Sequence, residues 1–481
     1  MGKSVVSPVV LAAAMTPQMS TARRPMSGPM RAGSWNSSIA RAVYAPVGHD
    51  LAADPRDGAG VDNIVFTEIK HCRICGNANL VSVLDLGEQH LTGVFPSSQS
   101  HRVGRGPIRL VKCIGDGAQD ACGLVQLAHN FAAGDLYGET YGYRSGLNRA
   151  MVDHLHRKVD ALRKLAPVGA GDFVLDIGSN DGTTLGRYPE GGPTLVGIDP
   201  SARKFAKYYR PDVELVVDFF SAEVFRKRFG ERKAKIVTSI AMFYDLEHPQ
   251  AFVDDVAGIL ADDGVWHLEQ SYLPSMLRTN AFDTACHEHS EYYALRQIDW
   301  MMRRAGLRII DVELNATNGG SFAVTVAKAQ AAVPARPAVV ERMLMEEAAL
   351  GLDTVKPFEA FWQRVLTARQ DLLAFFAQAK RDNKTVIGYG ASTKGNVVLQ
   401  FCGITPDMMP CIAEVNEDKF GHVTPGTLIP IVSEQQAHAM KPDYFLVLPW
   451  HFREGIIARE ADFRARGGKL VFPLPALDIV A

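Results

Sequence analysis

Val174-Leu-Asp-Ile-Gly-Ser-Asn-Asp-Gly182 is the stretch of this chain that decides its fold. An apolar run leads into Asp176, and Gly178 and Gly182 follow it. Such a run is typical of a buried parallel strand, and the glycines allow a tight turn and a close approach of backbone to ligand. The D-x-G-x-x-x-G spacing differs from the G-x-G-x-x-G loop that seats a dinucleotide pyrophosphate. The stretch therefore predicts a ligand-binding turn after a strand, with a plain strand-to-helix turn as the alternative.

Further strand signals that end in acids follow this turn. Residues 194–199 end in Asp199, whose carboxylate would accept hydrogen bonds from ribose hydroxyls. Residues 215–220 contain Asp218, which suits an adenine amino group, and Phe219, which with its neighbour could lie against the adenine ring. Two more apolar runs occupy residues 235–240 and 264–269. The alternation of strand and helix signals predicts an α/β fold with a doubly wound parallel sheet.

The composition is that of an ordinary globular protein. The chain has 481 residues, 47% of them hydrophobic and 22% charged, which is enough for two or three domains. A net charge of −2 provides no basic field for nucleic acid, and no apolar run approaches the ~20 residues of a membrane span. Seven unevenly placed cysteines favour a reducing cytoplasm. Residues 1–65 predict a disordered leader or an upstream start codon, with a transit-like segment as the alternative.

Four cysteines form a candidate metal site ahead of the predicted sheet. Cys72 and Cys75 form a C-x-x-C knuckle, and Cys113 and Cys122 follow about forty residues later. Four thiolates hold Zn²⁺ tetrahedrally and stabilise a small domain that lacks a large core. The pattern predicts structural zinc, with ordinary reduced cysteines and a redox pair as alternatives.

A cluster of acid–base groups follows the fifth predicted strand. Residues 283–293 contain His287, Glu288 and His289 in succession. Histidine titrates near neutrality and suits general-base catalysis, and a neighbouring carboxylate can orient an imidazole. The spacing lacks the i, i+4 histidines of a helical zinc site. The cluster therefore predicts catalysis rather than metal binding.

The C-terminal third predicts a second α/β domain. Apolar stripes at helical spacing over residues 295–305 and 358–376 predict packed helices. A strand over residues 384–390 runs into glycines with Lys394 behind them, which predicts an anion site suited to a diphosphate. A bare turn and a nicotinamide dinucleotide site are the alternatives. Further strand signals lie at residues 409–415 and 444–450.

The order of these motifs resembles that of the nucleotide-sugar C-methyltransferases of deoxysugar pathways. The resemblance covers roughly residues 68–481. It is carried by the cysteine knuckles with residues 122–127, the tyrosine-rich residues 139–145, the glycine loop at 176–182, the H-E-H segment, residues 318–322 and residues 388–396.

The resemblance implies a fold and its cofactors. The glycine loop is similar to motif I of the class I S-adenosylmethionine (SAM) methyltransferases. The implied domains are a zinc-binding domain at 66–135, a SAM domain at 136–330 and a Rossmann-like nucleotide-sugar domain at 331–481. The implied SAM contacts are Asp176, Gly178, Asn180, Gly182, Asp199, Asp218 and Phe219, and the implied zinc ligands are Cys72, Cys75, Cys113 and Cys122.

The resemblance also implies a reaction. The family methylates carbon 3 of a nucleotide-linked 4-ketosugar, a small-molecule substrate, and its base is the last histidine of the H-E-H run, here His289, beside Glu288. Tyr141 and Tyr143 are the candidate donors to the enolate oxygen, with packing tyrosines as the alternative. The remaining candidate catalytic residues are His287 and Cys286. The implied substrate contacts are Asn318, Gly388, Gly390, Ser392, Lys394 and Asn396. The sugar, the stereochemistry and the oligomeric state stay open.

Two positions depart from the antibiotic-sugar members of that family. Cys286 stands where those members have tyrosine, and Asp245 stands near the place of a histidine that follows the fourth strand. Tyr244 or His248 could substitute for that histidine. A thiol is a poor hydrogen-bond donor, so the enolate stabiliser and the regiochemistry are open.

Three other functions are compatible with parts of the sequence. Methyl transfer to oxygen or nitrogen would need no carbon-acid base. The zinc knuckles could belong to a protein that binds or modifies nucleic acid, although the charge argues against it. The loop at Gly388 could serve an NAD-linked oxidoreductase.

Overall fold

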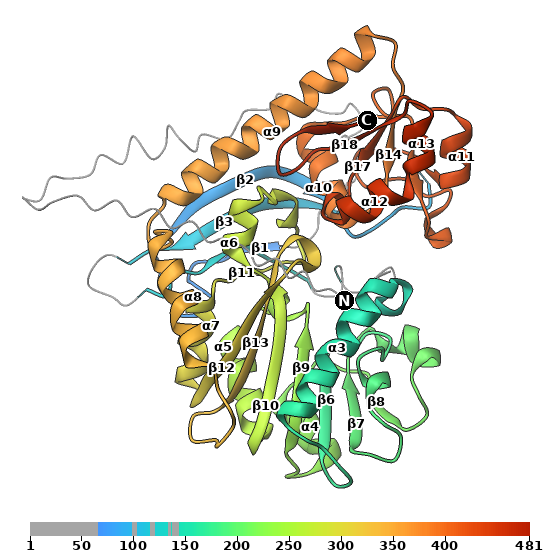
Figure 1. Cartoon of the computed structure of the whole chain (residues 1–481). Helices are drawn as coiled ribbons and strands as arrows, with labels where there is room; N and C mark the ends of the chain where they lie inside the picture. The colour runs from blue at the N-terminus through green and yellow to red at the C-terminus, as the bar shows by residue number, and fades with distance from the viewer. Residues whose placement is uncertain (1–65, 99–102, 116–120, 133–135, 137–143) are drawn as a thin grey trace, which may run out of the picture. The chain divides into compact units, whose positions relative to one another are not determined.

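The computed structural model describes residues 66–98, 103–115, 121–132, 136 and 144–481 (Figure 1). Tyr141, Tyr143 and the predicted leader lie outside the described residues. In the part that is described, no helix has the length and apolar character needed to cross a membrane.

The central sheet confirms the predicted α/β fold. Its strand order is β12-β13-β10-β9-β6-β7-β8. The strands from β10 to β8 in this order run parallel to one another. The parallel strands are β6 (Phe173–Ile177), β7 (Thr194–Ile198), β8 (Val213–Val216), β9 (Ala234–Ile240) and β10 (Leu260–Ser271). Every residue of β6 is buried, as its apolar run predicts.

An antiparallel hairpin completes this sheet and makes it mixed rather than wholly parallel. β12 (Leu307–Asn315) and β13 (Ser321–Lys328) form the hairpin, and β13 pairs antiparallel with β10. The turn between them contains Asn318, with φ of 55°, followed by Gly319 and Gly320. This turn lies at the same end of the sheet as the glycine loop, because both contribute to one cavity.

Helices cover the sheet and bring polar residues to it. α3 (Arg149–Leu165) begins at Asn148, whose side chain accepts hydrogen bonds from the backbone N–H groups of Ala150 and Met151. Figure 1 shows α3 beside β6 and β10. The other helices of this region are α4 (Ala222–Phe229), α5 (Pro249–Ile259), α6 (Leu273–Arg278) and α7 (Leu295–Arg304). Only short 3₁₀ segments, η2 (Leu185–Arg187) and η3 (Ala202–Tyr208), separate β6 from β7 and β7 from β8.

The cysteine-rich region forms a sheet that includes a strand from the middle of the chain. Its order is β11-β4-β3-β2, from β2 (Leu80–His90), β3 (Arg105–Cys113), β4 (Val125–Leu127) and β11 (Glu291–Tyr292). β1 (Phe66–Glu68) and β5 (His129–Phe131) pair separately. β11 directly follows the H-E-H segment and pairs antiparallel with β4.

The C-terminal region forms a second α/β sheet, as predicted. Its order is β16-β15-β14-β17-β18-β19, and β19 alone of these is antiparallel to its neighbour. The strands are β14 (Val386–Tyr389), β15 (Ile412–Glu414), β16 (Ile431–Ser433), β17 (Tyr444–Val447), β18 (Lys469–Phe472) and β19 (Asp478–Val480). α10 (Thr393–Cys402) follows β14, and α11 (Glu434–Ala439), α12 (Arg453–Arg459) and α13 (Ala461–Ala465) come later.

Two helices connect the sheets along the chain. α8 (Pro337–Ala349) is followed by α9 (Lys356–Arg381), the long orange helix of Figure 1. The apolar stripe predicted for residues 358–376 is buried, with Phe358 and Phe361 each 2% exposed. The stripe is therefore core, as the sequence predicts.

Candidate active site

A cavity of about 210 Å³ lies at the carboxyl ends of the parallel strands. The charged residues among its described lining are all acidic. They are Asp176, Asp181, Asp199, Asp245 and Glu269. SAM carries a sulfonium and an ammonium charge, so a wall of carboxylates suits it, whereas a diphosphate would be repelled. The cavity therefore fits the cofactor that the sequence predicts.

The glycine loop forms one wall of the cavity, as predicted. Gly178 has φ of 71°, and a Cβ there would lie 3.0 Å from Met242 Cγ. A Cβ on Gly182, with φ of 76°, would lie 2.9 Å from the Tyr209 ring. Both positions therefore require glycine for backbone conformation and for space. Asp176 is 3% exposed, and burial raises the pKa of its carboxyl to about 7.

Hydrogen bonds hold Asp199, the predicted ribose contact, at the cavity. Asp199 accepts hydrogen bonds from the N–H of Asn180 at 2.7 Å and from the N–H and hydroxyl of Ser201, each at 2.7 Å. Phe219 also lines the cavity. Asp218 is exposed beyond the end of β8 and is absent from the described lining, so its contact with adenine stays a prediction.

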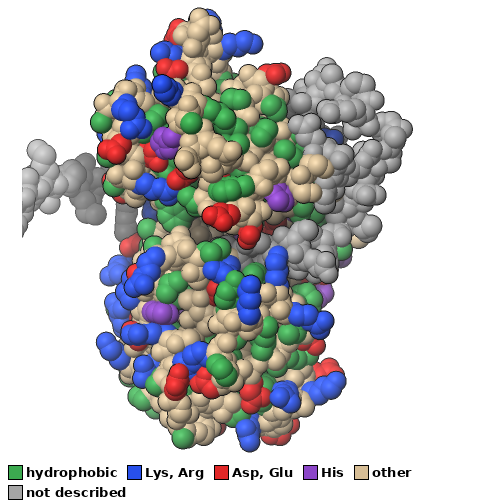
Figure 2. Space-filling view, turned by 90° about the vertical axis from the view of Figure 1, so that its right-hand side faces the viewer, with side chains coloured by type: hydrophobic (Ala, Val, Ile, Leu, Met, Phe, Trp, Pro, Cys, Tyr) green, Lys and Arg blue, Asp and Glu red, His purple; other side chains and the backbone are tan. Residues whose placement is uncertain are grey.

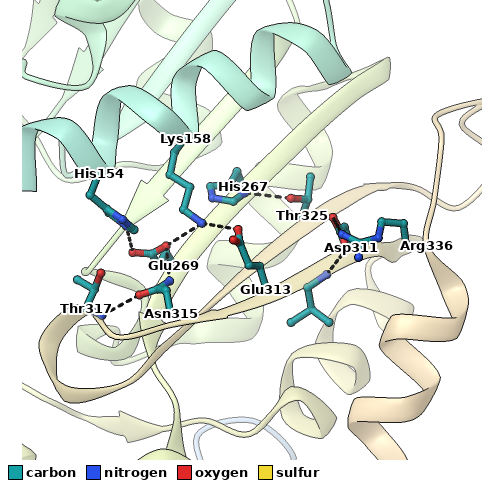
Figure 3. A network of polar contacts seen from close by, with 11 residues as sticks. His154, Lys158, His267, Glu269, Asp311, Glu313, Asn315, Thr317, Thr325 and Arg336 are labelled. Carbon is teal, nitrogen blue, oxygen red and sulfur yellow. Dashed lines mark hydrogen bonds and ion pairs between the residues drawn. The ribbon is translucent and has the colours of Figure 1, made fainter. Parts of the chain in front are cut away.

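A buried charge network holds α3 against the cavity wall (Figure 3). Glu269, 2% exposed, lies 2.6 Å from His154 Nε2 and 3.3 Å from Lys158 Nζ, and both partners come from α3. Its second oxygen accepts a hydrogen bond of 2.9 Å from Asn315 Nδ2 on β12. Lys158 Nζ reaches Glu313 at 2.9 Å. Glu269 therefore ties α3, β10 and the hairpin together around the cavity.

Sequence reasoning missed this network and the residue beside it. The position of Glu269 at the end of an apolar strand, and the i, i+4 spacing of His154 and Lys158, were the available signals. Gln270 also lines the cavity and is 2% exposed. Neither its amide nitrogen nor its amide oxygen has a hydrogen-bond partner among the described residues. A bound ligand would supply such a partner.

The four predicted zinc ligands come together. Their sulfur atoms all lie within 4.8 Å of one another, and Cys72, Cys113 and Cys122 are buried. Four thiolates at this separation fit one tetrahedral Zn²⁺, which would supply folding stability and leave no open position for catalysis. Cys113 and Cys122 therefore complete the four-sulfur site despite their wide spacing in the sequence.

The last histidine of the H-E-H segment is held by a backbone hydrogen bond. His289 Nδ1 lies 2.7 Å from the carbonyl oxygen of Thr284, so Nδ1 carries the proton and donates it. Nε2 has no partner among the described residues and keeps its lone pair. Burial is the main cause that lowers the pKa of His289 to about 4, and Lys394 adds to the effect. The imidazole is therefore neutral at physiological pH, with the lone pair on Nε2.

The neighbours of His289 have different surroundings. His287 is 1% exposed, and its Nε2 donates to the carbonyl oxygen of Gly106 at 3.1 Å, which fastens the segment to β3. Glu288 lies against Gly93: a Cβ added to Gly93 would be 2.6 Å from Glu288 Oε1. Burial raises the pKa of Glu288. Cys286 is buried, and burial raises the pKa of its thiol well above the usual value. Catalytic roles for these three residues stay predictions.

The zinc-binding sheet holds this segment in place. The N–H of Leu127 donates to the carbonyl oxygen of Ser290 at 2.8 Å, and Gln297 Nε2 donates to the carbonyl oxygen of Cys122 at 2.8 Å. Arg73 Nε lies 3.7 Å from Glu291 Oε1, and both side chains are buried. Residues that follow the H-E-H run are therefore held by the metal-binding region.

The two residues proposed to stand in for the usual histidine lie in different places. The Tyr244 ring centroid is 4.4 Å from that of His289. His248 is exposed at the beginning of α5. Tyr244 is therefore next to the predicted base, and His248 is on the surface.

The predicted substrate contacts meet at the first turn of α10. Lys394 Nζ donates to the carbonyl oxygen of Asn318 at 2.6 Å, and Asn396 Nδ2 donates to that of Thr92 at 2.7 Å. Ser392 caps α10 by accepting from the N–H of Gly395. Gly388 and Gly390 pack closely against other parts of the protein. A Cβ on Gly388 would lie 2.7 Å from Ile412, and a Cβ on Gly390 would lie 2.7 Å from Pro449. Internal packing therefore accounts for both of these glycines.

Replacement of Glu269 by alanine should weaken SAM binding. His154, Lys158 and the Asn315 amide would lose their shared buried partner, and α3 contributes Met151 and Leu155 to the cavity. We expect the SAM Kd, measured by calorimetry, to rise about tenfold, which corresponds to about 1.4 kcal/mol. Glu313→Ala is the control, because that side chain is 68% exposed and should contribute little. Equal affinities for wild type and Glu269→Ala would contradict this role.

Acid should destabilise the protein partly through His287. Burial lowers its pKa to about 4, below the ~6.5 of an unfolded chain. The unfolded chain therefore binds more protons between these values, and stability present above pH ~6.5 is lost as the pH falls toward 4. At pH 5 the loss is about 2 kcal/mol for this residue. The urea midpoint should fall less between pH 7 and pH 5 for His287→Gln than for wild type. An equal fall in both proteins would refute this assignment.

Comparisons with known proteins match the three regions in order. Residues 72–137 match the family described as "Putative zinc binding domain", residues 143–312 match "Methyltransferase domain", and residues 316–475 match "C-methyltransferase C-terminal domain". The C-methyltransferase NovU of Streptomyces niveus is 31% identical over 422 residues, which are 87% of this chain and 98% of NovU.

Two similar solved structures each cover somewhat more than a third of the chain. A chain from the complex of the Haloferax volcanii Trm112 methyltransferase activator with a methyltransferase is 20% identical, covers 38% of this chain and 94% of its own, and has a TM-score of 0.30. CalS10, an amino pentose methyltransferase of Micromonospora echinaspora, is 16% identical over 37% of this chain and 93% of its own, with a TM-score of 0.28. The assignment does not depend on these likenesses. The acidic cavity, the cysteine cluster, the three regions in order and the full-length similarity to NovU show that the chain belongs to the SAM-dependent C-methyltransferases.

Proposed function

We propose that this enzyme methylates carbon 3 of a nucleotide-linked 4-ketosugar through an enolate formed by His289. The observation that carries the proposal is the state of His289: Nδ1 donates to a backbone carbonyl, and Nε2 keeps its lone pair. Methyl transfer to oxygen or nitrogen needs no such carbon-acid base. The sugar and its position come from the resemblance of the motif set to the nucleotide-sugar C-methyltransferases.

The reaction divides between the residues in a simple way. His289 Nε2 removes the proton beside the ketone, and the electron pair of that C–H bond forms the enolate. SAM supplies an electrophilic methyl group. The enolate carbon takes that methyl group, the ketone re-forms, and S-adenosylhomocysteine and the proton are released. Glu288 lies beside the base, and we place the nucleotide sugar along Asn318, Ser392, Lys394 and Asn396.

Two rival functions find little support. For an NAD-linked enzyme the glycines at 388 and 390 would have to admit a pyrophosphate, but a Cβ on them would meet Ile412 and Pro449, so internal packing already accounts for both glycines. Figure 2 shows basic and acidic side chains interspersed on the visible face, where nucleic-acid binding would favour a basic surface. We place the enzyme in the cytoplasm, where thiols stay reduced.

The test is a reaction of the enzyme with SAM and a panel of nucleotide-linked 4-ketosugars in D₂O. Mass spectrometry and NMR should find a methyl group on carbon beside the ketone and S-adenosylhomocysteine as co-product. Methyl groups on oxygen or nitrogen, or SAM binding with no product from any ketosugar, would overturn the proposal.

Replacement of His289 by alanine should abolish exchange of the substrate α-proton with solvent. A general base contributes roughly 10²–10⁴-fold to the rate, so NMR should record a fall of that order with S-adenosylhomocysteine bound. SAM affinity should be unchanged. The control is His248→Ala, an exposed histidine at the beginning of α5. Exchange at the wild-type rate in His289→Ala would move the base to another residue.

A further inference from the structure

Lys394 extends from the first turn of α10 to the wall of the SAM cavity. Its Nζ donates to the carbonyl oxygen of Asn318 at 2.6 Å, and Asn318 lines that cavity. An ammonium group has three N–H donors. In the part of the chain that the structure describes, the other two donors have no partner, and no carboxylate forms an ion pair with Nζ. The ammonium group of Lys394 can therefore donate further hydrogen bonds at the edge of the SAM cavity.

The positive charge of Lys394 acts on the acid–base segment. α10 contacts η5 (Phe282–Thr284), and Thr284 supplies the carbonyl that orients His289. The charge lowers the pKa of His289, after the larger effect of burial, and it lowers the pKa of Asp283 against a larger rise from burial. Asp283 Oδ2 accepts from Trp450 Nε1 at 2.7 Å, and among the described residues its carboxylate forms no ion pair with Lys394. A cation and the predicted base therefore share one desolvated region.

The surroundings of Lys394 fit one oxygen atom better than a diphosphate. Ser392 already caps α10 by accepting from the N–H of Gly395. Pro449 packs against Gly390, and the lysine side chain reaches the β12–β13 turn rather than this glycine loop. Its charge is thus directed toward the turn that lines the SAM cavity.

We propose that Lys394 is the electrophilic residue of the reaction, donating a hydrogen bond to the ketone oxygen and stabilising the oxyanion that forms when His289 takes the α-proton. The inference rests on the proposed function. The C–H electron pair becomes the new C=C bond, the carbonyl π pair moves to the oxygen beside Lys394, and the proton stays on His289 Nε2. When the carbon acquires its methyl group, the oxygen pair returns to the carbonyl. Lys394 thereby supplies the donor that Cys286 and Asp245 do not provide in this chain.

The test compares proton exchange with nucleotide binding in Lys394→Met. Removal of one oxyanion donor costs about 10²–10³ in rate, so α-proton exchange at saturating ketosugar, with S-adenosylhomocysteine bound, should fall by that factor. Calorimetry should give unchanged affinities for SAM and for UDP or dTDP, and zinc content should stay that of wild type. In Lys394→Ala, added ethylammonium should restore part of the exchange rate.

Lys419→Met is the matched control. Its Nζ, like that of Lys394, donates to a backbone carbonyl, here that of Ala391, but it packs over Phe95. We expect exchange at the wild-type rate in this variant. Wild-type exchange in Lys394→Met, or a large loss of UDP and dTDP affinity with exchange intact at saturation, would overturn the inference and leave Lys394 as a diphosphate contact. Absence of exchange and methylation in the wild-type enzyme would instead contradict the proposed function.

Discussion

The antiparallel pairing of β11 with β4 is the contact on which the active site depends. It makes a two-residue strand from the middle of the chain an edge of the zinc-binding sheet. Arg73 and Glu291, and Gln297 with the carbonyl of Cys122, reinforce the same junction. Because His289 lies just before β11, its position is set by residues that precede the SAM domain in sequence. Zinc would thus support catalysis by holding a segment in place rather than by chemistry of its own.

Electrostatics divide the site into two parts. The SAM cavity is lined by carboxylates, which suit a sulfonium ion, and Glu269 uses its charge to fasten α3. Lys394 donates to the carbonyl oxygen of Asn318, and its charge adds to the burial that lowers the pKa of His289 to about 4. An acidic cavity for the donor and a cation for the acceptor would keep the two substrates in separate subsites. Our reaction scheme needs this separation, because the enolate is negative and the methyl donor is positive.

Local signals predicted the parts of the structure that depend on local chemistry. The glycine loop after β6, the cysteine cluster and the helix at 295–304 follow from strand patterning, metal-ligand spacing and helical periodicity. The sequence did not reveal the β12–β13 hairpin, the entry of β11 into the zinc-binding sheet, or the Glu269 network. The entry of β11 and the Glu269 network join segments that are far apart, such as His154 and Glu269, 115 residues from each other. Periodicity and spacing carry no information about such pairings.

Hydrogen–deuterium exchange of the backbone with zinc bound and after its removal by a chelator tests the central claim most directly. If the zinc-binding sheet holds the acid–base segment, the amides of β4 and of residues 287–292 should lose protection together, including the Leu127 N–H that bonds Ser290. Amides of β6 and β7 should keep theirs, because those strands pair only within the central sheet. Unchanged protection of residues 287–292 in the zinc-free protein would contradict the account.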